Sequence, residues 1–546
     1  MGKFMEFVKV YWKSLFTIFW PVFPAFIFIY DYSPPYRCIY VVIIMCGYWI
    51  TECIAPPITS LLPMILFPLM GILSSDKVAA NYMNDTNMML IGSIVIAIAM
   101  EESRLHIRIA LYVIKFVGCS IKRLHVGLCV VTAFISMWIA NTAATALMLP
   151  IVEGSLVAMQ EQGLLQMWQK PKDATIGGKD EHEEEDLDPT DITMCYYISI
   201  AYMATIGGTG CIIGSGSHLA YKGVYETRFP NSPGVEFAKW MMFNIPIMII
   251  NGILTITWMQ FWFFGLFRSR SRKARAVNLS AEAERVAREI IDQQIHDLKE
   301  LNFAEIVVGI SFVSCVLLWF FRRPGFMTGW PKLITDVKVG DAVVAIIIVM
   351  VVIVIPFYPD FLYFFTRDED KRPIAPTRSI VSWKTIEHKM HWGLLFILGG
   401  GFAMADAAKA SGMTELIANS LKSFLQNDKI YILIVCIGMA SIITQFLSSN
   451  VACVTILTPI IMDMSVVAKL HPMYLGLSVA LACCLCFLLP VSTPPNALIA
   501  GPCRVKGVEM AKAGIGVYFI CLTTLLCIFP IWAPVIWDLE FPDWVH

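Results

Sequence analysis

Long apolar stretches separated by short polar turns make up most of the chain. In the first half they cover about 14–30, 38–73, 87–104, 124–137, 193–213 and 239–267. In the second half they cover 303–321, 341–362, 391–408, 429–447, 473–490 and 514–537. A helix needs ~17–25 apolar residues to cross a bilayer. The pattern therefore predicts about eleven transmembrane helices with two shorter insertions.

Composition supports this interpretation. The 546 residues are 57% hydrophobic and 15% charged, whereas soluble domains carry about 25% charged residues. We therefore expect an all-α polytopic membrane protein. The net charge of -1 gives no indication of a nucleic-acid partner. The sequence contains no Walker A motif, nucleophile elbow or zinc-ligand spacing, so we expect neither an enzyme nor a bound cofactor.

Two polar stretches divide the chain. Residues 159–192 hold an acidic block and are expected to form a soluble loop, and residues 268–302 hold a basic run followed by an amphipathic helix. The division is 1–158 for the start of a first repeat, 159–192 for the acidic loop, 193–267 for the end of that repeat, 268–302 for the basic loop and 303–546 for a second repeat. Because basic loops stay inside, we expect a cytoplasmic N-terminus, an extracellular C-terminus and a plasma-membrane location.

Two short motifs look like copies of each other. Asn141 and Asn450 each stand beside small residues in an apolar stretch, and each is followed nine positions later by Pro-Ile. An amide at that depth is expected only where it meets a partner or a ligand. A hydrogen bond between helices is the simpler explanation for one such Asn. The duplication at equal spacing favours a binding site between two repeats.

Each motif is followed by a break in the next apolar stretch, at 214–218 and at 492–496. Glycine and proline interrupt helices and free backbone groups. Helix N-termini suit an anion, and freed carbonyl oxygens suit a cation such as Na⁺. His218 lies in the first break, where it is either a satisfied buried side chain or a group for anion binding or pH sensing. If each half has an odd number of passes, the repeats are inverted.

At these residues the chain resembles the divalent-anion/sodium symporter family, and within it the animal citrate and dicarboxylate carriers of the INDY type. The similar segments lie at 50–57, 136–141, 398–403, 449–452 and 489–497. The resemblance implies two re-entrant hairpins in inverted repeats, with the Asn motifs at their tips. It also implies a homodimer in which a transport domain moves like an elevator against a scaffold domain.

The resemblance assigns roles to individual residues. The substrate-binding candidates are Asn141, Thr142, Gly214, Ser215, His218, Ser449, Asn450, Val451, Thr493, Pro494 and Asn496. The candidates for sodium sites are Ser136, Asn141, Gly214 and Asn450. No other cofactor is implied.

The chain departs from the family pattern at two of these places. Ala140 stands where a serine hydroxyl would ligate sodium and substrate, and His218 stands where the family pattern has Asn. We therefore expect a secondary carrier for citrate or C4-dicarboxylates (succinate, malate, fumarate) that works without sodium. The alternatives are a sodium-coupled dicarboxylate symporter, a carrier for sulfate or another oxyanion, and a channel or sensor that binds a metabolite.

Overall fold

The computed structural model describes residues 2–118, 120–163, 165–169, 188–268, 281–324, 327–365, 372–447, 449–501 and 503–545. The helices of the first half are α1 (Gly2–Phe19), α2 (Ile27–Tyr30), α3 (Pro34–Thr51), α4 (Pro56–Thr59), α5 (Leu62–Leu69), α6 (Ser75–Tyr82), α7 (Asp85–Glu102), α8 (Leu105–Val117), α9 (Ile121–Ser136), α10 (Asn141–Glu161), α11 (Asp191–Gly208), α12 (Gly216–Arg228) and α13 (Phe237–Phe264). A short hairpin of β1 (Trp168–Gln169) and β2 (Asp188–Pro189) lies between α10 and α11.

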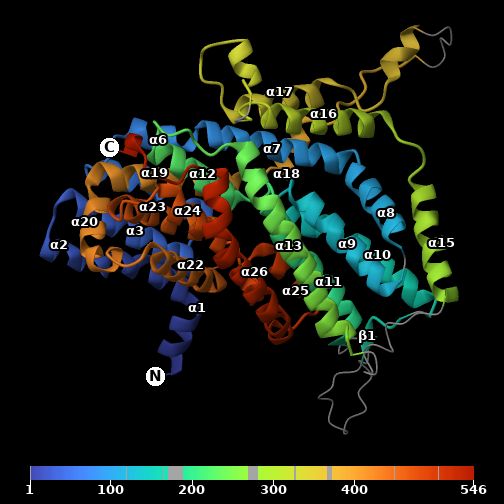
Figure 1. Ribbon diagram of the computed structural model, residues 1–546, viewed down its shortest axis with the longest axis horizontal. Coiled ribbons are helices and arrows are strands. Elements are labelled where there is room, and N and C mark those ends of the chain that lie inside the picture. The colour runs from blue at the N-terminus through green and yellow to red at the C-terminus, as the bar shows by residue number, and fades with distance from the viewer. Residues whose placement is uncertain are drawn as a thin grey trace.

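The helices that follow complete the fold (Figure 1). They are α15 (Ala281–Asp297), α16 (Phe303–Phe320), α17 (Asp341–Val354), α18 (Trp383–Lys389), α19 (Trp392–Ser411), α20 (Met413–Ser420), α21 (Lys422–Leu425), α22 (Lys429–Phe446), α23 (Asn450–Val467), α24 (Pro472–Ala482), α25 (Pro494–Ala500) and α26 (Gly507–Ile536).

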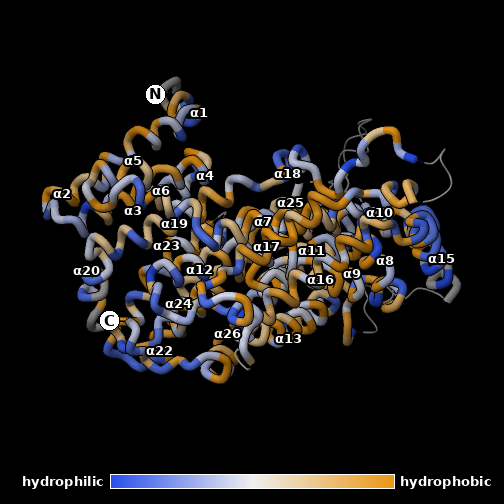
Figure 2. Tube along the Cα trace, turned by 90° about the horizontal axis from the view of Figure 1, so that it is seen from above, coloured by the Kyte–Doolittle hydropathy of each residue, from blue (hydrophilic) through white to orange (hydrophobic). Residues whose placement is uncertain are grey.

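Among the described residues, nine helical stretches are long and apolar enough to cross a membrane, and three shorter apolar helices accompany them. The expectation of an all-α polytopic membrane protein is confirmed. The expected count of about eleven spans is larger because broken spans are divided between short helices, such as the eleven-residue α24. Figure 2 shows apolar residues along most of the bundle, whereas α15 at its edge is polar.

Two helix hairpins carry the Asn motifs. α9 and α10 form the first, with its tip at 137–140, and α22 and α23 form the second, with Leu447 and Ser449 at its tip. A proline lies inside each returning helix, Pro150 in α10 and Pro459 in α23. The two predicted breaks are also present. One separates α11 from α12, and the other separates α24 from α25.

The broken helices exchange partners between the two halves. α11 packs against α9 and α10, but its continuation α12 packs against α19 and α23 in the other half. In the same way α24 packs against α22 and α23, whereas α25 packs against α10 and α11. Both breaks therefore lie where the halves meet.

Three successive glycines in α19 allow this crowded packing. A methyl group on Gly399 would collide with Tyr82, one on Gly400 with Ser60, and one on Gly401 with Thr455. α19 therefore packs directly against α6, the end of α4 and α23. It fixes the wall against which α12 packs.

Several sequence expectations need correction. The first helix starts at Gly2 instead of about 14. The polar segment 216–228, expected only as the end of a break, is a helix. In the stretch 341–362 the α-helix ends at Val354, and in 473–490 it ends at Ala482. Most of the acidic loop and of the basic run falls outside the described residues.

Candidate functional site

Asn141, the first residue of α10, closes the tip of the first hairpin. With its amide nitrogen facing the break, it donates hydrogen bonds to the carbonyl oxygens of Ala204 at 3.2 Å and Gly214 at 3.0 Å. It also reaches Ser136 Oγ at 3.0 Å. Ser136 is buried, and its hydroxyl donates to the Ala204 carbonyl at 2.6 Å. The tip is thus tied to α11 and to the first break.

Backbone atoms crowd around this tip because two glycines lack side chains. A methyl group on Gly214 would lie 2.6 Å from the Gly208 carbonyl oxygen, 2.8 Å from that of Ser136 and 2.9 Å from that of Met137. A methyl group on Gly208 would collide with the side-chain amide of Asn141. Three carbonyl oxygens therefore converge on Gly214. Oxygen atoms of this kind coordinate Na⁺ in carriers with broken helices.

The tip of the second hairpin differs in chemistry. Ser449 caps α23, and its side chain accepts a hydrogen bond from the Ala452 amide at 3.3 Å. Asn450 is buried and donates from Nδ2 to Cys486 Sγ at 3.0 Å. Asn450 Oδ1 has no hydrogen-bond partner among the described residues. A buried polar atom without a partner is rare in proteins and indicates a ligand or water.

Asn496 holds the second break in place. Its Nδ2 donates to the carbonyl oxygens of Cys486 at 3.1 Å and Leu489 at 3.2 Å. Asn496 Oδ1 is buried and has no partner in the described part of the chain. Thr493 is buried at the N-cap of α25, and Pro494 is the first residue of that helix. The oxygen available to a ligand at the second break thus belongs to a side-chain amide, whereas those at the first break belong to backbone carbonyl groups.

The two breaks touch each other. Ser217 Oγ lies 3.3 Å from Cys484 Sγ, and Ser215, the N-cap of α12, lies 2.7 Å from Ser217 through their hydroxyl oxygens. A methyl group on Gly216 would lie 3.1 Å from Val451 Cγ2 at the second tip. The predicted residues of both halves therefore surround one region.

His218 lies between Trp240 and Cys484 of the second break. It is fully buried, its ring packs against Trp240 at 5.0 Å between centroids, and its Nε2 lies 3.4 Å from Cys484 Sγ. Its Nδ1 has no partner among the described atoms. A role for His218 in anion binding stays a prediction.

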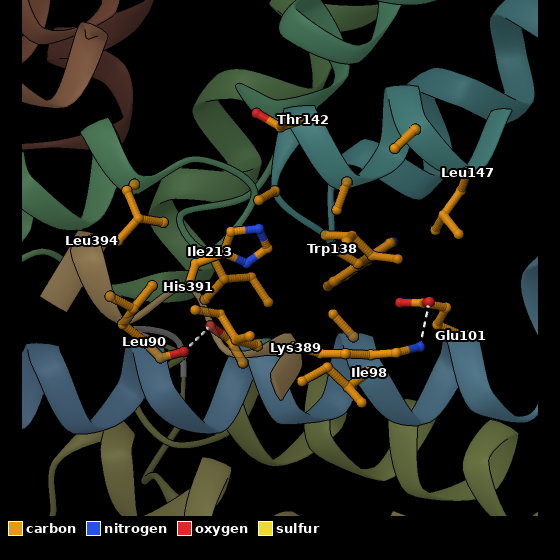
Figure 3. A pocket seen from close by; sticks show the side chains of 18 of the residues that line it. Leu90, Ile98, Glu101, Trp138, Thr142, Leu147, Ile213, Lys389, His391 and Leu394 are labelled. Atoms are coloured by element: carbon orange, nitrogen blue, oxygen red, sulfur yellow. Dashed lines mark hydrogen bonds and ion pairs between the residues drawn. The ribbon is translucent and has the colours of Figure 1, made fainter. Parts of the chain in front are cut away.

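A cavity of about 500 Å³ opens beside the first tip (Figure 3). Most of its wall is apolar, as is common for binding sites of small molecules. Its polar lining comes from Ser93, Glu101, Thr142, His388, Lys389 and His391. Of the predicted binding residues, Thr142 lines it directly. Gly216, which touches Val451 of the second tip, lines it as well.

Lys389 at the end of α18 crosses the floor of this cavity in Figure 3. Its Nζ lies 2.5 Å from Glu101 Oε1 and 2.9 Å from Glu102 Oε1. Partial burial alone would lower the pKa of Lys389, but the hydrogen bonds and charges of the two glutamates outweigh it and raise that pKa. Lys389 therefore stays charged at neutral pH.

Sequence reasoning did not identify the charged residues that line this cavity. It assigned no site role to Glu101, Glu102 or Lys389. The only available signal was the presence of charged residues directly beside apolar spans at both places.

The two tips fit a bound cation to different degrees. In the first half, the Asn141 amide nitrogen already engages the oxygens around it, and Ala140 adds no hydroxyl. In the second half, Asn450 Oδ1 and Asn496 Oδ1 are unpartnered among the described residues and would suit a hard cation, although the neighbouring Cys486 thiol would not. When bound, Na⁺ would supply charge balance for an anion.

Comparisons with known proteins agree with this geometry. A family model described as the sodium:sulfate symporter transmembrane region matches residues 12–538. The Drosophila melanogaster protein named I'm not dead yet is 40% identical over 548 residues, which cover 100% of this chain and 93% of that protein. The Na(+)/citrate cotransporter of Mus musculus is 33% identical over 93% of this chain and 93% of its own. The Na(+)/dicarboxylate cotransporter 3 of Mus musculus is 32% identical over 93% of this chain and 90% of its own.

Solved structures share the fold at low sequence identity. The YdaH transporter of Alcanivorax borkumensis has a TM-score of 0.52 at 11% identity and covers 84% of this chain and 88% of its own. MtrF of Neisseria gonorrhoeae has a TM-score of 0.50 at 13% identity, with 83% of each chain covered. The resemblance found in the sequence is confirmed by the family model and by the relatives. The chain belongs to the sodium:sulfate symporter family of membrane transporters.

Proposed function

We propose that the protein is a secondary carrier for citrate or C4-dicarboxylates that works by alternating access. The observation that carries this proposal is the meeting of two Asn-bearing hairpin tips and two helix breaks around one region beside the cavity. Relatives named as citrate and dicarboxylate cotransporters support the substrate class. A carrier needs one site that both sides can reach in turn, and a site between two repeats supplies it.

The chemistry of the tips suits carboxylates. Asn141 and Asn450 are the first residues of α10 and α23. The amides of a first helical turn lack partners within the helix, and the helix dipole makes this end positive. Carboxylate groups bind such ends favourably.

The test replaces each Asn by Ala and measures uptake of labelled citrate, with the amount of protein at the cell surface measured in parallel. We expect uptake to be lost in Asn141→Ala and in Asn450→Ala at normal surface levels. The matched control is Asn427→Ala, because that side chain is exposed and, within the described part of the chain, donates only to the nearby Phe424 carbonyl. Normal uptake in both site variants would contradict the proposed site.

We propose further that uptake does not require sodium. The support lies in the first half, where Ala140 lacks a hydroxyl and Asn141 directs donors at the surrounding oxygens. Replacement of sodium by choline should leave citrate uptake unchanged. A loss of uptake in choline would contradict sodium independence and favour a sodium-coupled dicarboxylate symporter.

Sulfate is a second candidate substrate, because the family model carries that name and helix N-termini also suit oxyanions. Competition separates the two. We expect excess succinate, but not excess sulfate, to suppress labelled citrate uptake.

We also propose a plasma-membrane homodimer, as the family resemblance implies. Cross-linking in intact cells followed by electrophoresis would test the dimer. Surface biotinylation would test the location in the plasma membrane.

A further inference from the structure

The cavity beside the first tip has an opposing pair of hydrogen-bond donors. Lys389 lies on one side, on α18, and Trp138 lies on the other, at the tip of the first hairpin (Figure 3). The charged side chains that line the cavity are Lys389 and Glu101. His388 and His391 contribute imidazole rings. The rest of the described lining is apolar except for Ser93 and Thr142.

Trp138 lines the cavity with an indole ring that also packs edge to face against Phe312, at 5.0 Å between ring centroids. Trp138 is only 8% exposed, and its indole Nε1 has no hydrogen-bond partner among the described residues. A buried N–H group without an acceptor is costly, so such groups are rare unless a ligand or water completes them. The indole lies three residues before Asn141, so it belongs to the tip already assigned to substrate.

Lys389 can exchange its partners. Glu101 and Glu102 are its partners at 2.5 Å and 2.9 Å, and all three side chains are partly exposed. Ion pairs of this exposure are weakly held. A lysine ammonium has three donors, so an incoming carboxylate can take the remaining donor or displace a glutamate.

We propose that Lys389 and Trp138 form an outer subsite that holds one carboxylate group of the substrate, while another reaches the hairpin tip at Thr142 and Asn141. This inference rests on the proposed transport of di- or tricarboxylates. In the absence of substrate, Glu101 and Glu102 neutralise Lys389. When substrate enters, its carboxylate replaces Glu101, so Lys389 determines specificity for substrates with at least two carboxylates.

The test measures KM and Vmax for labelled citrate uptake in variants that separate substrate binding from structural support. Lys389→Met should raise KM about tenfold at unchanged Vmax, because the variant loses about one charge-assisted hydrogen bond to the substrate. Lys389→Arg, which keeps the cation, should stay near the wild-type KM. Trp138→Phe should raise KM roughly fivefold, because only the N–H donor is removed.

The decisive variant removes the competing carboxylates. Glu101→Gln combined with Glu102→Gln should lower KM, because Lys389 is then free for substrate. A purely structural ion pair predicts instead that this variant and Lys389→Met do the same damage. The matched control is Lys512→Met, which breaks an exposed lysine–glutamate pair of 2.9 Å with Glu509 at the start of α26 and should leave KM unchanged.

The subsite is overturned if Lys389→Met leaves KM unchanged, or if the lysine and glutamate variants shift KM in the same direction. Failure of the proposed function would look different, because the wild-type protein itself would then show no citrate uptake.

Discussion

Ala140 and Ser449 occupy the same position at the two hairpin tips, directly before the motif Asn, and they differ by one hydroxyl. Ser449 caps its helix through the Ala452 amide at 3.3 Å. No side chain caps α10 at Ala140. Because Ala140 has no hydroxyl, the first tip lacks both a side-chain N-cap and an oxygen ligand for a cation.

We expect Ala140→Ser to restore both functions. A new cap stabilises the start of α10 by about 0.5–2 kcal/mol, and the added oxygen gives a cation a further ligand. Citrate uptake by the variant should become faster in sodium than in choline, whereas uptake by the wild type should be equal in the two salts. Uptake by Ala140→Ser that stays equal in the two salts would show that this hydroxyl does not decide sodium use.

Gly208 is a second residue on which the first tip depends. Gly208→Ala should abolish most uptake, because the new methyl group displaces the Asn141 amide and breaks its hydrogen bonds to the break. Uptake per surface molecule is the measurement. Gly154→Ala in α10 is the control, since no described atom lies within 4 Å of the added methyl. Equal uptake by the two variants would contradict the close approach at Gly208.

At the scale of elements, α12 joins the two halves through a buried ionic network. Lys222 Nζ lies 3.0 Å from Asp341 Oδ2 and 2.6 Å from Glu226 Oε1, and Arg322 Nε lies 2.6 Å from Asp341 Oδ1. Lys222 and Asp341 are 2% and 1% exposed at their side chains. This network ties α12 to the start of α17. Any movement of α12 relative to α17 would have to break these ion pairs.

Asp341→Asn should therefore destabilise the protein strongly. The change leaves two buried cations without their shared partner, and loss of one partner from a buried pair costs about 3–5 kcal/mol. Thermal unfolding in detergent is the measurement. Asp292→Asn breaks the exposed pair with Lys115 and should cost at most about 1 kcal/mol. A similar small shift for Asp341→Asn would show that the network is not a structural tie.

The sequence predicts the elements that carry polar groups within apolar stretches. Asn141, Asn450 and the two breaks stand out because amides, glycines and prolines are conspicuous there. It does not predict the partner exchange of α12 and α25, because long-range packing leaves no periodic signal. Lys389 and Glu101 are 288 positions apart and become a pair only through the fold.

At the scale of the whole molecule, the two termini lie far apart in Figure 1. The C-terminal segment packs beside the end of α12 and the start of α24, where the Trp544 ring lies 5.6 Å between centroids from the rings of Phe229 and His471. The basic run at 268–275 is expected on the cytoplasmic side. We therefore expect a cytoplasmic N-terminus and an extracellular C-terminus.

Epitope tags at the two ends test this orientation. In intact cells an antibody should label a C-terminal tag, while an N-terminal tag should need permeabilisation. Labelling of the N-terminal tag in intact cells would reverse the proposed orientation.

The central claim is that the protein moves its substrate through one alternating site. Counterflow tests it most directly, with labelled citrate taken up by sodium-free proteoliposomes that are empty or preloaded with unlabelled citrate. A carrier with one alternating site predicts faster initial uptake into the preloaded vesicles, with Asn141→Ala and Asn450→Ala inactive in both. Equal uptake into empty and preloaded vesicles, or no uptake into either, would contradict it, as expected of a channel or a sensor.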